Sequence, residues 1–444
     1  MRSKLAVALA LAVCATGAQA DGNSNNNSFN DIFTNGHVDG ELRLYDFNRL
    51  YDTPATPDAH ALSLAALINA QTGAFWGGFS VGGSFVTANM LGTKDDNPAK
   101  VDTSLMGPNS SLGAWSQAYL QFKRDWFLFR GGYQYLNTPW MGGNDSRVIP
   151  SSYNAALAEF TPVKDWNIFA IRTFSWKSRT SNGMYDDNLY YPSKYNGDSM
   201  YGNNGALPLT APEANGTWAA GTNYTSGGFK GEAWYYNFLR FARMGYINGS
   251  YTFTTGTPFN PFIAVQALEE NSSSSDNIFV QTHTKLVGVA GDRVKAESWG
   301  ADIGTSIYDG RIDFAYNKLE SESGAVGNGA LISPYTVNYG TDPLFTTSMI
   351  RGLVEIGPGH AWKGRAQYNF FDKKLQLVAA YAKYDSVERG TSHDLYFDII
   401  YNMDSVLKGL QLRDRWERSV GGTGNLNPGN ESFTYNRVMI SYKF

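Results

Sequence analysis

The chain has 444 residues, of which 14% are aromatic, 47 are glycine and only 17% are charged. A formal net charge of −4 argues against nucleic acid as a partner, and no stretch is apolar over the roughly 17 to 25 residues that a membrane-spanning helix needs. Many aromatic residues and glycines with little charge favour a sheet that is apolar on one face and wet on the other.

Residues 1–20 have the pattern of a cleaved signal peptide. A positively charged start and an apolar run lead to residues 18–20, Ala-Gln-Ala, which is the small-x-small pattern that signal peptidase recognises. We therefore expect export and a mature chain, residues 21–444, that begins at Asp21 and has no cysteine. The only cysteine, Cys14, leaves a lipoprotein signal as an alternative, which the valine before it disfavours.

Segments of about ten residues with alternating polar and apolar side chains follow, separated by clusters of Gly, Asn, Asp and Ser. In chain order the clearest lie at residues 38–49, 126–135, 299–308, 362–370 and 438–444. In the first, Val38, Gly40, Leu42 and Leu44 share the apolar face, and Glu41, Arg43, Tyr45, Phe47 and Arg49 share the other. The alternation predicts strands, with a tight type I′ turn at Asp309-Gly310 and a short turn at residues 372–374.

A water-soluble β-sandwich would also show such alternation. Two features favour a membrane barrel instead: aromatic residues gather near strand ends, and Arg, Lys, Gln and Asn occupy the middle of the polar faces. Short turns also alternate with long polar loops, predicted at residues 181–215, 269–285, 320–345 and 421–431. This organisation predicts a closed antiparallel transmembrane β-barrel with short periplasmic turns and long extracellular loops.

The last strand carries the sharpest local motif. Val438, Ile440, Tyr442 and Phe444 fall on one face, and the chain ends on the phenylalanine. Such an ending looks like the sorting signal of bacterial outer-membrane barrels. It predicts an outer-membrane location and recognition of the strand ending at Phe444 by the barrel-assembly machinery.

Several segments resemble the OprD-type outer-membrane porin family. They are residues 40–49 (GELRLYDFNR), 132–139 (GYQYLNTP), 144–150 (NDSRVIP), 153–155 (YNA) and 409–415 (GLQLRDR). They are spread over the start, the first third and the end, so the resemblance extends over the mature chain. The loops at residues 181–215 and 320–345 match nothing in the family pattern, which leaves the substrate open.

The resemblance implies about eighteen strands, some loops folded inward to form a constriction, and uptake of small, mostly carboxylate-bearing nutrients along lumenal arginines. It places Asp145, Arg147 and Pro150 near the constriction.

The alternation itself assigns faces to the other arginines. A barrel has no free edge, so its first strand pairs with its last. Inward-facing arginines of three neighbouring strands then form what we call the arginine strip, made of Arg43, Arg49, Arg413, Arg415 and Arg437. Arg130 and Arg365 also face the lumen. Guanidinium groups hold a carboxylate through two parallel hydrogen bonds, with Glu41, Asp394 and Asp398 as balancing acids. The alternative is that these charges only brace a hydrated lumen.

The sequence therefore predicts passive, partly selective uptake of small polar or carboxylate-bearing solutes, with no cofactor or metal. A general diffusion porin is the alternative within transport. A barrel hydrolase is disfavoured because the five histidines are scattered and no Gly-x-Ser-x-Gly motif is present. An energy-coupled transporter would need a plug domain before the first strand. Expected partners are solutes, outer-membrane lipid and lipopolysaccharide, with no nucleic acid, and the chain is expected to be a monomer or a trimer.

Overall fold

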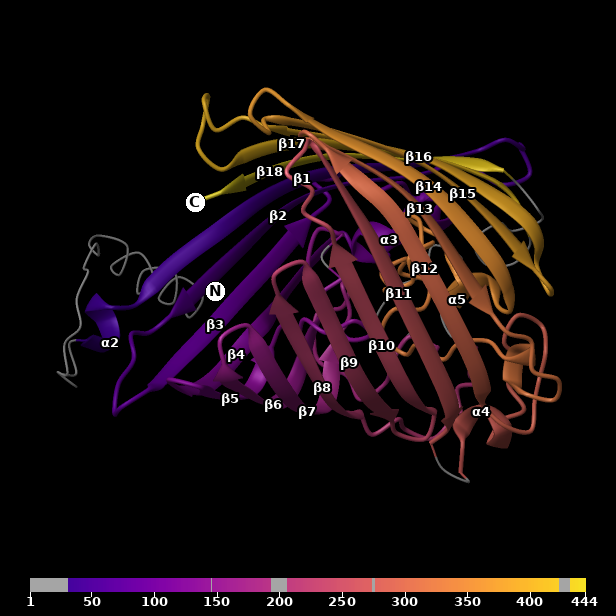
Figure 1. Ribbon diagram of the computed structural model, residues 1–444, viewed down its shortest axis with the longest axis horizontal. Coiled ribbons are helices and arrows are strands. Elements are labelled where there is room, and N and C mark those ends of the chain that lie inside the picture. The colour runs from indigo at the N-terminus through magenta and orange to yellow at the C-terminus, as the bar shows by residue number, and fades with distance from the viewer. Residues whose placement is uncertain (1–30, 145, 193–205, 274–275, 423–431) are drawn as a thin grey trace.

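The computed structural model describes residues 31–144, 146–192, 206–273, 276–422 and 432–444. The predicted signal peptide, with Cys14 and the expected start at Asp21, lies outside the described residues, and so does Asp145. Within the described part, eighteen strands form a single antiparallel sheet that closes on itself (Figure 1). The predicted fold class and strand number are confirmed.

The strands are β1 (His37–Tyr51), β2 (Ala59–Gln71), β3 (Phe79–Asn89), β4 (Ser111–Arg124), β5 (Phe127–Gln134), β6 (Ser152–Val163), β7 (Trp166–Lys177), β8 (Thr217–Ser226), β9 (Phe229–Phe238), β10 (Ala242–Thr252), β11 (Phe259–Ser272), β12 (Lys295–Ile307), β13 (Gly310–Leu319), β14 (Gly359–Phe370), β15 (Leu375–Ser386), β16 (Gly390–Asn402), β17 (Leu410–Gly421) and β18 (Phe433–Lys443). Short helices are α2 (Asp31–Thr34), η1 (Pro98–Lys100), α3 (Thr103–Met106), α4 (Ile278–Gln281), η2 (Val326–Asn328) and α5 (Leu353–Ile356).

Each strand pairs with its neighbours in the sequence, and β1 also pairs with β18. Leu44 of β1 lies opposite Leu64 on one side and Ile440 on the other. Closure satisfies the backbone hydrogen-bonding groups that an open sheet would leave exposed in lipid. The predicted pairing of the first strand with the last is therefore confirmed.

The side chains alternate in the sense opposite to that of a soluble protein. In β12, Trp299 and Ile303 point outward and are 49% and 53% exposed, whereas Ser298 and Asp302 point inward and are 4% and 8% exposed. A surface of large apolar side chains around a polar interior is the arrangement of a transmembrane barrel. The soluble sandwich is thereby excluded.

The two ends of the barrel differ as predicted. Connections at the periplasmic end span at most seven residues, whereas those at the extracellular end include residues 90–110, 135–151, 178–216, 273–294 and 320–358. Three extracellular connections are nevertheless short, at residues 52–58, 239–241 and 387–389. Exposed aromatic side chains such as Trp126, Tyr308 and Phe371 lie in the periplasmic turns, where they form an interfacial girdle.

Two loop boundaries and one turn type that the sequence predicted were wrong. Strand β11 runs to Ser272, so Glu269 belongs to the strand and not to the loop. The loop after β13 extends to residue 358, because its inward-folded part continues to α5. The two-residue turn after β12 is Tyr308–Asp309, with a positive φ of 51° at Tyr308 only, so the Asp309-Gly310 dipeptide does not form a type I′ turn.

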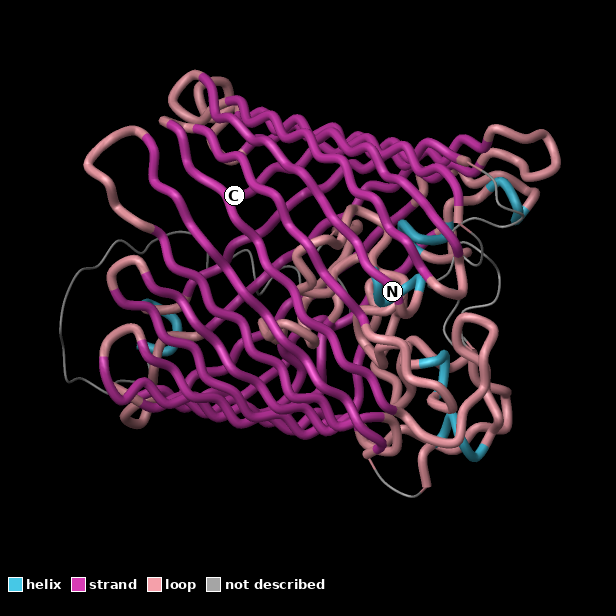
Figure 2. Tube along the Cα trace, turned by 45° about the vertical axis from the view of Figure 1, so that its right-hand side comes forward, coloured by secondary structure: helices cyan, strands magenta, loops and turns pink. Residues whose placement is uncertain are grey.

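Loops enter the lumen from the extracellular end (Figure 2). Trp140 and Val148 of the β5–β6 loop (residues 135–151) and Tyr335 and Leu353 of the β13–β14 loop (residues 320–358) are buried. These loops therefore fill part of the lumen. No helix in the described part of the chain is long and apolar enough to cross a membrane.

Phe444 completes the barrel at its periplasmic end. Its backbone exchanges two hydrogen bonds with Gly40 of β1, with N–O distances of 2.9 and 3.0 Å. Its ring also covers Gly40, because a Cβ there would come within 2.5 Å of the ring. We expect deletion of Phe444 to reduce folded barrel in the outer membrane severalfold, as measured by heat-modifiable gel mobility. Lys443→Ala is the matched control, and normal assembly of the deletion variant would contradict this role.

Candidate functional site

The residues of the arginine strip lie on the neighbouring strands β1, β18 and β17. Arg437 of β18 is directly opposite Arg415 of β17 on one side and Phe47 of β1 on the other. Arg43 of β1 is opposite Ser441 of β18. All of these side chains are on the inward face, so strand pairing joins residues that are almost 400 positions apart in the sequence.

Arg43 joins the barrel wall to the β5–β6 loop. Its Nη1 donates to the carbonyl oxygen of Arg147 at 3.1 Å, and its Nη2 donates to Glu41 Oε2 at 2.8 Å. Arg147 in turn donates from Nε to the Ser104 carbonyl at 2.9 Å. Burial, together with repulsion by other arginines, lowers the pKa of Arg147 to about 9. Arg43 therefore fixes the β5–β6 loop against the wall, and Arg147 fixes it against α3 in the connection between β3 and β4.

Arg49 and Arg437 pack among aromatic rings. The guanidinium of Arg49 lies 4.6 Å from the ring centre of Phe433 and 4.3 Å from that of Tyr435. That of Arg437 lies 4.2 Å from Tyr435 and 5.1 Å from Phe47. Cation–π contacts of this kind favour guanidinium groups that have lost water. Both side chains are buried in this aromatic layer.

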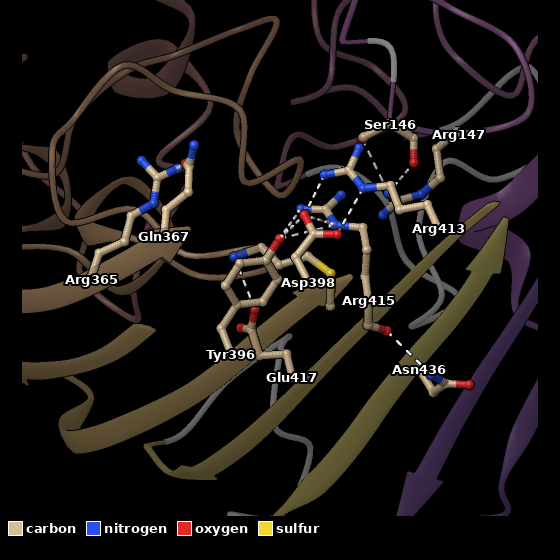
Figure 3. A network of polar contacts seen from close by, with 11 residues as sticks. Ser146, Arg147, Arg365, Gln367, Tyr396, Asp398, Arg413, Arg415, Glu417 and Asn436 are labelled. Atoms are coloured by element: carbon tan, nitrogen blue, oxygen red, sulfur yellow. Dashed lines mark hydrogen bonds and ion pairs between the residues drawn. The ribbon is translucent and has the colours of Figure 1, made fainter. Parts of the chain in front are cut away.

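Arg413 and Arg415 are the strip members that reach open space. Their side chains are 28% and 13% exposed, and both lie beside Asp398 of β16 (Figure 3). Arg413 Nε and Nη2 donate to the two carboxylate oxygens of Asp398 at 2.9 and 2.5 Å. Arg415 Nε and Nη2 donate to Tyr396 Oη at 3.2 and 3.1 Å. These two side chains are therefore partly accessible from the lumen.

A cavity of about 290 Å³ opens beside this pair, between the wall and the β13–β14 loop. Its charged lining residues are Lys363, Arg365, Arg413, Arg415, Asp394 and Asp398. Four cationic and two anionic side chains give the cavity a positive balance. The volume suits a small molecule, at the lower end of the range for ligand pockets.

The loop side of the cavity is Thr347, Ser348 and Met349. Glu417 Oε2 accepts from the Met349 backbone N–H at 2.9 Å, and Ser348 Oγ lies 2.9 Å from Glu417 Oε1 and 3.0 Å from Asp394 Oδ2.

Lys363 Nζ donates to the Thr347 carbonyl at 2.8 Å. The β13–β14 loop is therefore bound to β14, β16 and β17 at the cavity.

The remaining predicted site residues are separate from the strip. Arg130 donates from Nε and Nη2 to Gln121 Oε1 on β4, at 3.0 and 2.5 Å, and is outside the cavity. Arg365 lines the cavity and donates to Gln367 Oε1 at 2.6 Å. Pro150 lies in the inward-folded loop, where its carbonyl accepts from Lys177 Nζ at 2.7 Å.

Sequence reasoning missed Lys363, Tyr396 and Glu417 as site residues. Lys363 is on the polar face of its predicted strand, and Glu417 is two residues after the inward-facing Arg415. The two-residue alternation therefore predicts that both side chains face the lumen. Their role depends on contact with residues 347–349 of the β13–β14 loop. No periodicity marks that segment, so the sequence provided no signal for the contact.

The opposite side of the lumen is filled by aromatic packing. Tyr335 of the β13–β14 loop makes edge contacts with Tyr153 and Trp176, with ring centres 5.4 and 5.5 Å apart, and its hydroxyl lies 3.1 Å from Thr217 Oγ1. Such packing leaves little room for a solute near β6 to β9. The open space beside the arginine pair is therefore the candidate site.

The β13–β14 loop contains two buried carboxyl groups that respond to pH. Burial raises the pKa of Asp342 to about 6, and burial with repulsion from Asp342 holds the pKa of Glu355 well above its usual range. Ionising a carboxyl with a raised pKa destabilises the folded loop. This cost is absent below the ordinary pKa of the carboxyl, grows as pH rises from that value to the raised pKa, and is fully present above it.

We expect Asp342→Asn to slow proteolysis within the β13–β14 loop severalfold at about pH 8 and to change it little at about pH 3.5, below the ordinary pKa of the carboxyl. The amide keeps an oxygen that accepts from Thr347 Oγ1, as Asp342 Oδ1 does at 2.7 Å. Limited proteolysis of wild type and variant at both pH values measures the effect. An equal effect at the two values would refute the ionisation cost.

A closed barrel with an apolar outer wall, a charged lumen and inward-folded loops has the architecture of an outer-membrane pore. Its fold is that of the OprD/Occ-type porins, as the sequence resemblance predicted. The structure superposes on Pseudomonas aeruginosa OccK9 (OpdG) with a TM-score of 0.74 at 14% identity, covering 93% of this chain and 99% of that chain.

Two further porin structures show the same fold. A BenF-like porin from Pseudomonas fluorescens Pf-5 gives a TM-score of 0.73 at 14% identity, over 92% of this chain and 98% of that chain. Pseudomonas aeruginosa OpdK with vanillate gives 0.70 at 13% identity, over 92% and 98%. No protein-family model matches the chain, and no protein of curated function matches its sequence.

Proposed function

We propose that the chain is an outer-membrane channel for passive uptake of small carboxylate-bearing or polar solutes, with Arg413 and Arg415 as the main contacts. The observation that carries this proposal is the cavity with four cations and two carboxylates beside the only strip members that are partly exposed. In the proposed path a solute carboxylate meets the arginine pair below the β13–β14 loop. Lys363 and Arg365 attract it electrostatically.

The same proposal covers the buried arginines, the chemical class of the solute and the partners of the outer wall. Arg43, Arg49, Arg147 and Arg437 hold the wall and the β5–β6 loop in place, so we assign them a supporting role in transport. Vanillate in the OpdK structure is a small aromatic carboxylate, and we extend that chemical class to this chain. Outer-membrane lipid, lipopolysaccharide and the barrel-assembly machinery remain the expected partners of the outer wall and of the terminal strand.

Single-channel currents through the reconstituted protein test the proposal. We expect benzoate and similar carboxylates to interrupt the potassium chloride current at concentrations at which neutral or amine analogues of the same size do not. Carboxylate binding should be strongest in low salt, where charge is screened least. Equal responses to all three classes would favour the alternative of a general diffusion porin.

A further inference from the structure

The carboxylate of Asp398 occupies the arginine pair in the way that a solute carboxylate would. Arg413 donates two parallel hydrogen bonds to it, at 2.9 and 2.5 Å, and Arg415 Nε lies 3.7 Å from Oδ2. This two-point contact is the strongest geometry that a guanidinium offers to a carboxylate. The Nε–Nη2 edge of Arg413 is therefore already in use.

Neighbouring groups hold Asp398 in this position. Tyr396 Oη donates to Asp398 Oδ2 at 2.6 Å, and the same oxygen of Tyr396 accepts from Arg415 (Figure 3). The Asp398 side chain is only 4% exposed, whereas that of Arg413 is 28% exposed. The arginine thus faces the cavity, and the carboxylate lies against the wall beside it.

The second acidic residue of the cavity has a different partner. Asp394 Oδ2 lies 3.0 Å from Ser348 Oγ, so this carboxylate contributes to the attachment of the β13–β14 loop. Lys363 and Arg365 donate to the Thr347 carbonyl and to Gln367. Among the charged residues that line the cavity, Asp398 is thus the carboxylate bound to the solute-facing arginine pair.

We infer that Asp398 is an internal competitor for solute carboxylates, and thereby determines how long a solute stays in the cavity. It occupies the two-point edge of Arg413 until a solute displaces it, and it returns when the solute leaves. This inference rests on the proposed function, because it concerns the same arginine pair.

Competition of this kind suits a channel. Two arginines without an acidic partner, in a lumen that is poorer in water than bulk solution, would bind a carboxylate tightly and release it slowly. Conduction requires binding that is favourable enough to draw the solute in and weak enough to let it go. A neutral residue at position 398 should therefore increase affinity and lower the rate of exit.

The test is the residence time of benzoate in single channels of the full-length protein carrying Asp398→Asn. The amide keeps the shape of the side chain and removes its charge. We expect residence about tenfold longer than in wild type, because one competing charge-assisted contact is lost. The increase should persist in about 1 M salt, because screening weakens distant charges much more than a direct contact.

Asp302→Asn is the matched control. Asp302 is a lumenal carboxylate that pairs with Arg311 at 3.2 Å and does not line the cavity. Its loss should raise the rate of benzoate entry in low salt only, with residence unchanged. Unchanged or shorter residence in Asp398→Asn would overturn the inference. Equal lengthening in Asp302→Asn would also overturn it, since the cause would be net charge.

Two further comparisons keep the outcomes distinct. If Asp398→Asn fails to form a heat-modifiable barrel, Asp398→Ser carries the same expectation. If benzoate interrupts the current of neither wild type nor Asp398→Asn, the proposed function fails and the inference fails with it. If benzoate interrupts the wild-type current and residence does not lengthen in the variant, only the inference fails.

Discussion

Replacing both Arg413 and Arg415 by alanine is expected to reduce benzoate flux about tenfold or more, because each arginine supplies charge-assisted hydrogen bonds to the solute. The two substitutions also leave Asp398 without its bidentate partner, so the cavity loses attraction and gains an unpaired negative charge. Flux into proteoliposomes and benzoate interruption of single-channel currents measure the effect. The difference from wild type should be larger in low salt.

Two comparisons separate the causes. Adding Asp398→Asn to the double variant removes the unpaired charge, so any recovery of flux measures repulsion and the remaining deficit measures lost arginine contact. Arg130→Ala removes a lumenal arginine that lies outside the cavity and should reduce flux little. Carboxylate flux that is unchanged in the double variant would show that the arginine pair only braces the wall.

Shortening the β13–β14 loop should have the second large effect. Replacing residues 330–350 with a short Gly-Ser connection removes Tyr335, which packs in the lumen against β6 to β8, and the segment 347–349, which borders the cavity on the other side. We expect conductance to rise severalfold and discrimination between carboxylates and neutral solutes to fall. Barrel strands should still form, because they pair with one another through backbone hydrogen bonds that do not involve the loop.

The same connection placed at residues 52–58 is the control. That extracellular loop is short and mostly exposed, so its replacement should leave conductance near the wild-type value. Planar-bilayer recordings of both variants provide the comparison. Wild-type conductance after removal of residues 330–350 would mean that this loop does not limit the pore.

The faces of the strands were predictable because side chains in a strand alternate with a period of two. Once Leu44 and Val438 were assigned to lipid, Arg43 and Arg437 had to face inward. Closure of the barrel then placed these two strands together, although almost the whole chain separates them. The arginine strip was therefore predictable from local pattern and one topological rule.

Which arginines of the strip support a loop and which face the cavity was not predictable from the sequence. Arg43 became a support for the β5–β6 loop because its partner is the carbonyl of Arg147, 104 positions away. The contact of Glu417 with Met349 spans 68 positions. Such contacts depend on how aperiodic loops pack in the lumen, and alternation in the strands carries no information about that packing.

The most direct test of the account is a crystal structure of the full chain with 4-bromobenzoate, in which anomalous scattering locates the bromine. We expect a bromine peak in the cavity beside the β13–β14 loop, with the ligand carboxylate within hydrogen-bonding distance of Arg413 and Arg415. An occupied site elsewhere in the lumen, with this cavity empty and the arginine pair still bound to Asp398, would contradict it.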